Sequence, residues 1–153
     1  MYESDGKDRV VELPEVPTGA VGGSSPRIVA SDEAVVLSYL ADEPEGRVTV
    51  TFERCLAHYL GPPHDEVLDG HPLWEKGLFI YGVYRVDRSS WIRRLESLHA
   101  IHADHAGLKH FIWTFAESTF EVLAEGFAVS DVAEPPEAAD SAEEEEDSDG
   151  GSA

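Results

Sequence analysis

Residues 109–127 constrain the fold of this chain more than any other stretch. Their sequence, KHFIWTFAESTFEVLAEGF, alternates large apolar residues with smaller or polar ones, and this period of two predicts a β-hairpin. A register that places Phe115 opposite Phe120 and Trp113 opposite Val122 makes one face of the hairpin wholly apolar. A slip by one residue would bring glutamates into that row, so the pattern itself favours this register.

The other face of the same hairpin mixes apolar and polar side chains. The register places Ile112 opposite Leu123 and His110 opposite Glu125, and it leaves residues 116–119 as the loop. We therefore expect a half-exposed face on which His110 pairs with Glu125.

A strand and a helix are predicted just before the hairpin. The segment LFIYGVYRV (78–86) has the composition of a strand, and residues 89–105 carry an apolar stripe at helical spacing. Ser89 or Ser90 is the expected N-cap, and Gly107 is the expected C-cap. If the strands on either side of this helix are parallel neighbours, the connection between them should be right-handed.

A second hairpin is predicted from residues 33–41 and 47–56, around a turn that contains Pro44 and Gly46. Residues 57–77 then form a connection too long for a simple turn, stiffened by prolines and pinned by leucines. Together these elements predict an α+β fold, with a mostly antiparallel sheet of about five strands and one main helix packed on a face.

Composition divides the chain into three regions. Residues 1–26 are rich in Gly, Pro and Ser and predict a flexible N-terminal arm, with an added strand from VVELPEV as the alternative. Residues 27–130 predict a single globular α+β domain. Residues 131–153 hold ten acidic residues and no basic one, which predicts a disordered acidic tail. That tail carries half of the formal net charge of -20.

Charge and cysteine usage point to a compartment and a class of partner. Cys55 is the one cysteine, so an intramolecular disulfide cannot form and a reducing compartment is expected. No apolar run approaches the ~20 residues needed to cross a bilayer, and no secretory leader opens the chain. We expect a soluble cytoplasmic protein with no membrane partner. The acidity argues against nucleic acid and favours a basic protein partner, and exposed strand edges permit a monomer or a homodimer.

Histidines are the first candidate functional group, because imidazole binds Zn²⁺ and iron. Three of them lie on the predicted helix at a spacing of three residues, and two lie in the long connection. The candidate metal ligands are His64, His71, His99, His102 and His105. Their spacing matches neither HExxH nor a paired CxxC motif. The expectation is therefore no cofactor, with a divalent metal as the alternative.

Arginines around the start of the helix are the second candidate group. A helix N-terminus with serine hydroxyls and guanidinium groups suits a phosphate or carboxylate. The candidate anion-binding residues are Arg85, Arg88, Ser90, Arg93 and Arg94. The alternatives are a solvated basic edge and a site that receives the acidic tail. In the long connection, Asp65 and Trp74 are candidate contacts for a protein partner.

The chain resembles a family of small uncharacterised bacterial proteins in three segments: GPPHDEVLDGHPLW, YGVYRVDRSSWI and KHFIWTFAESTFE. The resemblance covers about half of the chain and implies no activity, cofactor or catalytic residue. In the family pattern the hairpin turn includes His-Asp, whereas this chain has Ala116 and Glu117 at those positions.

Three functions remain open from the sequence. The leading hypothesis is a non-enzymatic binding or adaptor protein that uses the long connection and the arginines. The second is a small metal-dependent enzyme that uses the histidines. The third is an inhibitory protein or nucleic-acid mimic, suggested by the negative charge.

Overall fold

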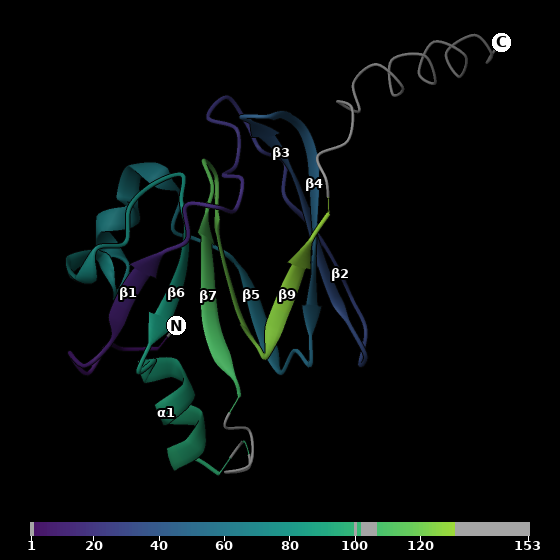
Figure 1. Ribbon diagram of the computed structural model, residues 1–153. Helices are drawn as coiled ribbons and strands as arrows, with labels where there is room; N and C mark the ends of the chain where they lie inside the picture. The colour runs from purple at the N-terminus through teal and green to yellow at the C-terminus, as the bar shows by residue number, and fades with distance from the viewer. Residues whose placement is uncertain (1, 100, 102–106, 131–153) are drawn as a thin grey trace, which may run out of the picture.

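The computed structural model describes residues 2–99, 101 and 107–130, which fold into two antiparallel sheets and one α-helix (Figure 1). The first sheet has the order β1 (Arg9–Glu12), β6 (Val83–Asp87), β7 (Lys109–Thr114), β8 (Thr119–Ala124), β5 (Ala57–Gly61). The second has the order β2 (Arg27–Ala30), β3 (Val35–Asp42), β4 (Glu45–Glu53), β9 (Gly126–Val129). The helices are α1 (Ser90–Ser97) and the short 3₁₀ helices η1 (Asp65–Gly70) and η2 (Trp74–Lys76). The predicted α+β class is confirmed, but nine strands form two sheets in place of one five-stranded sheet.

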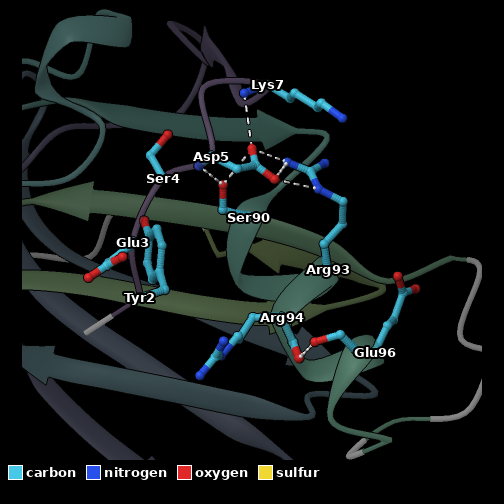
Figure 2. Close-up of a pocket in the computed structure, with 10 residues that line it drawn as sticks. Tyr2, Glu3, Ser4, Asp5, Lys7, Ser90, Arg93, Arg94 and Glu96 are labelled. Carbon is cyan, nitrogen blue, oxygen red and sulfur yellow. Dashed lines mark hydrogen bonds and ion pairs between the residues drawn. The ribbon is translucent and has the colours of Figure 1, made fainter.

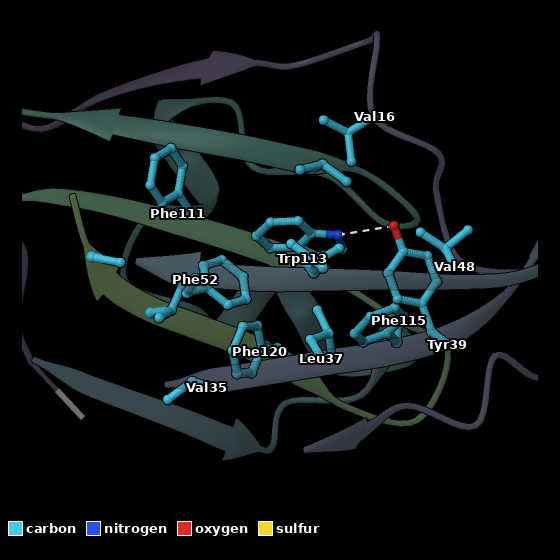
Figure 3. Close-up of a cluster of buried hydrophobic side chains, with 14 of the residues drawn as sticks. Val16, Val35, Leu37, Tyr39, Val48, Phe52, Phe111, Trp113, Phe115 and Phe120 are labelled. Atoms are coloured by element: carbon cyan, nitrogen blue, oxygen red, sulfur yellow. Dashed lines mark hydrogen bonds between the residues drawn. The ribbon is translucent and has the colours of Figure 1, made fainter. Parts of the chain in front are cut away.

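The main core lies between the two sheets and is built from one face of each. The alternation in β4 buries Val48, Val50 and Phe52 as the pattern predicted. Phe52 contacts Trp113 edge to face, at a ring-centroid distance of 5.4 Å. Figure 3 shows the aromatic side chains of both sheets meeting in this layer. Burial of so many large rings is the main source of stability in a domain of this size.

The register of the β7–β8 hairpin differs from the predicted one by two residues. Trp113 lies opposite Phe120, not opposite Val122, and Phe111 lies opposite Val122. Because the shift is even, every side chain keeps its predicted face. Thr119 begins β8, and its hydroxyl donates to the Pro63 carbonyl. The turn is therefore centred one residue earlier than expected. The hydrogen bond of Thr119 to Pro63 is found at this turn, and a contact of this kind leaves no periodic pattern in the sequence.

The predicted parallel crossover is wrong, because β6 and β7 are antiparallel neighbours. The helix between them ends at Ser97 and is capped by Leu98, and His99 follows with a φ of 57°. In Figure 1 this short helix lies beyond the ends of β6 and β7, so the chain re-enters the sheet at the end from which it left.

Much of the N-terminal region is part of the fold, where a flexible arm was expected. Its strand β1 pairs antiparallel with β6, in line with the alternative of an added strand. Val16 is buried in the main core, and the hydroxyl of Tyr39 donates to the Pro17 carbonyl. The glycine- and proline-rich composition masked these contacts, because single anchors in an irregular segment leave no periodic pattern.

The long connection also contains a strand that the sequence did not indicate. Residues Ala57–Gly61 form β5 at the edge of the first sheet, and the rest of the connection crosses the sheet with Leu68 and Leu73 buried beneath it. Among the described residues, no helix combines the length and apolar character that a bilayer crossing requires. The acidic tail, His102 and His105 lie outside the described residues.

Tyr39→Phe tests the polar link inside the main core. The Tyr39 hydroxyl accepts from the indole N–H of Trp113 at 3.1 Å and donates to Pro17, so its removal leaves a buried donor and a carbonyl without a partner (Figure 3). We expect a loss of about 1 to 3 kcal/mol in the free energy of unfolding, measured by urea denaturation. Tyr59→Phe is the matched control because its hydroxyl bond to Pro62 is exposed, and it should cost less than about 0.5 kcal/mol. Equal losses in both variants would contradict this role for Tyr39.

Candidate functional site

The second face of the first sheet is buried, although the sequence predicted a half-exposed one. His110 in β7 and Glu121 in β8 point to this face, and their side chains are 0% and 1% exposed. A second apolar cluster covers the face around them and includes Leu68, Leu73 and Ile112. The pairing of His110 with Glu125 is wrong: Glu125 lies 3.2 Å from Arg54, and His110 turns to the middle of the sheet.

The Glu121 carboxylate is the centre of a buried hydrogen-bond network. Its Oε2 lies 2.6 Å from Nε2 of His71, and its Oε1 lies 2.7 Å from Nε2 of His110. The hydroxyl of Tyr2 donates to the same Oε1 at 2.8 Å. We call these four residues the Glu121 network. It joins the N-terminal segment, the long connection and both strands of the central hairpin.

The second ring nitrogen of each histidine identifies its tautomer. Nδ1 of His71 accepts from the backbone N–H of Leu73 at 3.0 Å, so the His71 proton must lie on Nε2. Nδ1 of His110 lies 2.7 Å from Oγ of Ser89, which can donate a hydroxyl proton. Oγ of Ser89 accepts from the backbone N–H of Ile92 at 3.2 Å, so its own proton is directed to Nδ1 of His110. In this arrangement both imidazoles carry one proton and donate to Glu121 through Nε2.

The network keeps Glu121 ionised in a place that disfavours charge. Burial by itself raises the pKa of this carboxyl, but hydrogen bonds from His110 and His71 and the electrostatic attraction of the same two side chains outweigh it and lower the pKa from 4.5 to about 2. The pKa of Tyr2 is raised, first by burial and then by the negative charge of Glu121. Near neutral pH the site therefore contains a carboxylate and a protonated tyrosine.

A small pocket of about 110 Å³ adjoins the carboxylate, and we call it the aromatic pocket. It is lined by Tyr2, Tyr59, Trp91 and Glu121. Tyr59 comes from β5, directly opposite Glu121 in the ladder, and Trp91 comes from the first turn of α1. The rings of Tyr2 and Trp91 are parallel within 6°, with centroids 5.8 Å apart. Three separate elements thus place aromatic rings around one buried charge.

The predicted anion site at the start of α1 already contains two carboxylates of the chain itself. Asp8 accepts from the backbone N–H of Ser90 at 2.6 Å and from its hydroxyl. Asp5 accepts from Nε and Nη2 of Arg93 at 3.0 and 2.6 Å, as Figure 2 shows. The chemistry expected of these residues is therefore present, but the anion comes from the N-terminal segment.

The other predicted arginines do not converge on one point. Arg85 forms a two-point ion pair with Asp87, at 2.8 and 3.3 Å. Arg88 donates to the Lys7 carbonyl, and Arg94 lines the outer cleft between α1 and the N-terminal segment (Figure 2).

The candidate metal ligands are dispersed in the same way. His71 belongs to the Glu121 network, whereas His64 caps η1 and His99 is exposed after α1. No three His, Cys, Asp or Glu side chains of the described residues are grouped as ligands for a metal ion.

The candidate partner contacts lie on the long connection. Asp65 accepts from the Tyr81 hydroxyl at 2.5 Å, and Trp74 packs against Phe79, which is 57% exposed. Burial raises the pKa of the Cys55 thiol, which opposes the thiolate form that a nucleophile needs.

Sequence reasoning missed most of the aromatic pocket. Tyr2 lies in a segment expected to be flexible, and Tyr59 lies in a strand that was expected to be a loop. Glu121 carried one usable signal, because it is the one charged residue within the strand TFEVLA. An isolated carboxylate in a buried strand requires donors, and that requirement could have directed attention to His71 and His110.

No family model, curated protein or solved structure matches this chain. The resemblance to a family of small bacterial proteins therefore stays a prediction, and the geometry of the described residues carries the functional proposals.

The ionised state of Glu121 predicts a specific acid sensitivity. A carboxylate whose folded pKa is depressed stabilises the fold above its ordinary pKa of 4.5, and this stabilisation is lost as the pH falls towards about 2. Urea denaturation of the wild type and of Glu121→Gln should therefore show the wild type losing on the order of 3 kcal/mol more over this interval. Both proteins keep His71 and His110, so the difference isolates the carboxylate. Parallel pH profiles would contradict an ionised Glu121.

Glu121→Gln should also change one histidine and spare the other. The amide presents one acceptor and one donor, so one imidazole must accept through Nε2. His110 can do this by moving its proton to Nδ1 and donating to Ser89, whereas His71 cannot, because Leu73 N–H already occupies its Nδ1. Long-range ¹H–¹⁵N spectra should show the Nε2–H tautomer of both histidines in the wild type and a switch at His110 alone in the variant. A switch at His71 would contradict the assignment.

Proposed function

We propose that this protein is a non-enzymatic binding protein and that its ligand site is the aromatic pocket. The observation that carries the proposal is the position of Glu121, whose carboxylate forms part of a pocket walled by aromatic rings. Concave sites with largely apolar walls and one placed polar group are typical of ligand binding. The group that enters is small, because the pocket volume is about 110 Å³.

The Glu121 network supports a role in binding over one in catalysis. A general base must reach the proton that it removes. The imidazoles of His71 and His110 are 0% exposed, and each ring nitrogen is engaged within the protein. The network therefore suits a rigid scaffold that holds a negative charge in place.

The distribution of histidines gives less support to a metal-dependent enzyme. His64 and His99 are exposed on different elements, and only His71 of the candidate ligands belongs to a buried cluster of the described residues. The net charge of -20 supports a cationic ligand or a basic protein partner. The half-buried Cys55 thiol is in keeping with a reducing compartment such as the cytoplasm.

A titration with three probes that share a head of three methyl groups on one atom, but differ in charge, tests the proposed site. We would add tetramethylammonium, tert-butanol or pivalate to the full chain and follow the Trp91 indole N–H in ¹H–¹⁵N spectra. We expect at least one probe to shift this signal saturably, and Tyr59→Leu to weaken its binding by about 10-fold. Phe79→Leu is the control, because Phe79 is an exposed aromatic residue that does not line the pocket. No saturable shift with any probe, or an equal shift in Tyr59→Leu, would overturn the proposal.

A further inference from the structure

We infer that the aromatic pocket selects a positively charged alkylammonium group. This inference rests on the proposed function, because it assigns the ligand class of the same site. It is carried by the coincidence of two features in one pocket: three aromatic side chains and a buried carboxylate whose hydrogen-bond donors are a hydroxyl and two imidazoles, with no Lys or Arg among them.

The hydrogen-bond donors of Glu121 determine the charge of the network. Glu121 receives hydrogen bonds from three donors: the Tyr2 hydroxyl and the imidazoles of His71 and His110. With the Ser89 hydroxyl donating to Nδ1 of His110, each imidazole carries one proton and each donor is electrically neutral. His71 cannot supply a second proton, since its Nδ1 accepts from Leu73 N–H. Hydrogen bonds of this kind stabilise a carboxylate without cancelling its charge. The floor of the pocket therefore keeps a formal negative charge away from water.

The charged neighbours of the network reinforce that potential. Asp8 accepts from the backbone N–H of Ser90 at the start of α1 and is 4% exposed. Its negative charge also raises the pKa of the Tyr2 hydroxyl. Arg93, which lines the outer cleft beside Tyr2, is paired with Asp5. Arg94 lines only the outer cleft, where its side chain is exposed to solvent. The inner surface is thus electronegative.

The aromatic walls of the pocket favour a cation. Aromatic faces carry negative potential, and a cation within about 6 Å of a ring gains about 0.5 to 2 kcal/mol from each favourable contact. Tyr2, Tyr59 and Trp91 contribute such rings from three elements. An alkylammonium group combines a positive charge with an apolar surface, so it satisfies both the rings and the carboxylate. An anion would be repelled by Glu121, and a neutral group would leave the negative charge of Glu121 uncompensated.

The volume of the pocket limits the size of the group that enters it. At about 30 Å³ for each water, a pocket of about 110 Å³ accommodates about four water-sized groups. The head of a methylated amine has about four or five non-hydrogen atoms, which matches this space. Longer parts of the ligand would extend through the open side of the pocket.

An isosteric pair of probes tests the inference directly. Choline and 3,3-dimethyl-1-butanol have the same shape, with a positive nitrogen in one and a neutral carbon in the other. Isothermal titration of the full chain should show choline binding at least about 10-fold more tightly. If the alcohol binds as tightly as choline or more tightly, the ammonium inference is overturned while the pocket remains a binding site. If neither binds, both the inference and the proposed function are overturned.

Three variants separate the contributions. Trp91→Leu and Glu121→Gln should each weaken choline by about 10-fold. Glu121→Gln should leave the affinity for the alcohol within about 2-fold, because the two side chains have the same shape. Arg94→Gln should strengthen choline by about 2-fold at low salt, because it removes an exposed positive charge near the entrance. A weaker affinity of Arg94→Gln for choline would contradict the inferred sign of the site. Preserved ¹H–¹⁵N spectra of each variant show that the fold is intact.

The alkylammonium group can be carried by a small metabolite or by a side chain of a basic protein. A peptide containing trimethyllysine distinguishes these sources. Tighter binding of the peptide than of choline assigns the group to a protein partner, whereas weaker binding assigns it to a free amine. Both results support the inferred ligand class, and failure of both probes overturns it.

Discussion

The carboxylate of Glu121 sets the conditions under which the first sheet can be covered. An ionised group buried without partners costs several kcal/mol, so the fold must bring donors to this point. Those donors are Tyr2, His71 and His110, which belong to segments far apart in the sequence. The N-terminal segment and the long connection follow paths that bring Tyr2 and His71 to the carboxylate. The start of α1 places Ser89 against His110. A hydrogen-bonded charge of this kind makes one arrangement of the covering segments more stable than the alternatives.

The same requirement gives the site its character. Because neutral donors hold Glu121, its negative charge persists beside the aromatic pocket. Because His71 and His110 are engaged at both nitrogens, they orient the carboxylate and have no lone pair to offer a substrate. The ion pair of Asp5 with Arg93 and the contacts of Asp8 with Ser90 anchor the segment that carries Tyr2. One wall of the pocket therefore depends on the start of the chain.

The alternation of apolar and polar residues in the sequence predicted which strand faces are apolar. The apolar faces of the β7–β8 hairpin and of β4 follow from alternation, and so does the α+β class with one main helix. The number of sheets, the direction of β7 relative to β6 and the hairpin register depend on contacts between distant segments. The site could be predicted only in part. His71 was a candidate, but its partner Glu121 lies in a distant strand, and Tyr2 and Tyr59 lie where composition suggested loops. Long-range pairing of single side chains leaves no local signal.

Neutron diffraction from deuterated crystals would test the central claim most directly, because it locates the protons of the Glu121 network. We expect deuterium on Nε2 of His71, on Nε2 of His110 and on the Tyr2 hydroxyl, with none on either oxygen of Glu121 at neutral pH. Deuterium on the Glu121 carboxyl group, or on both nitrogens of either imidazole, would contradict it. Each of these two contradicting results would mean that the pocket contains no uncompensated negative charge.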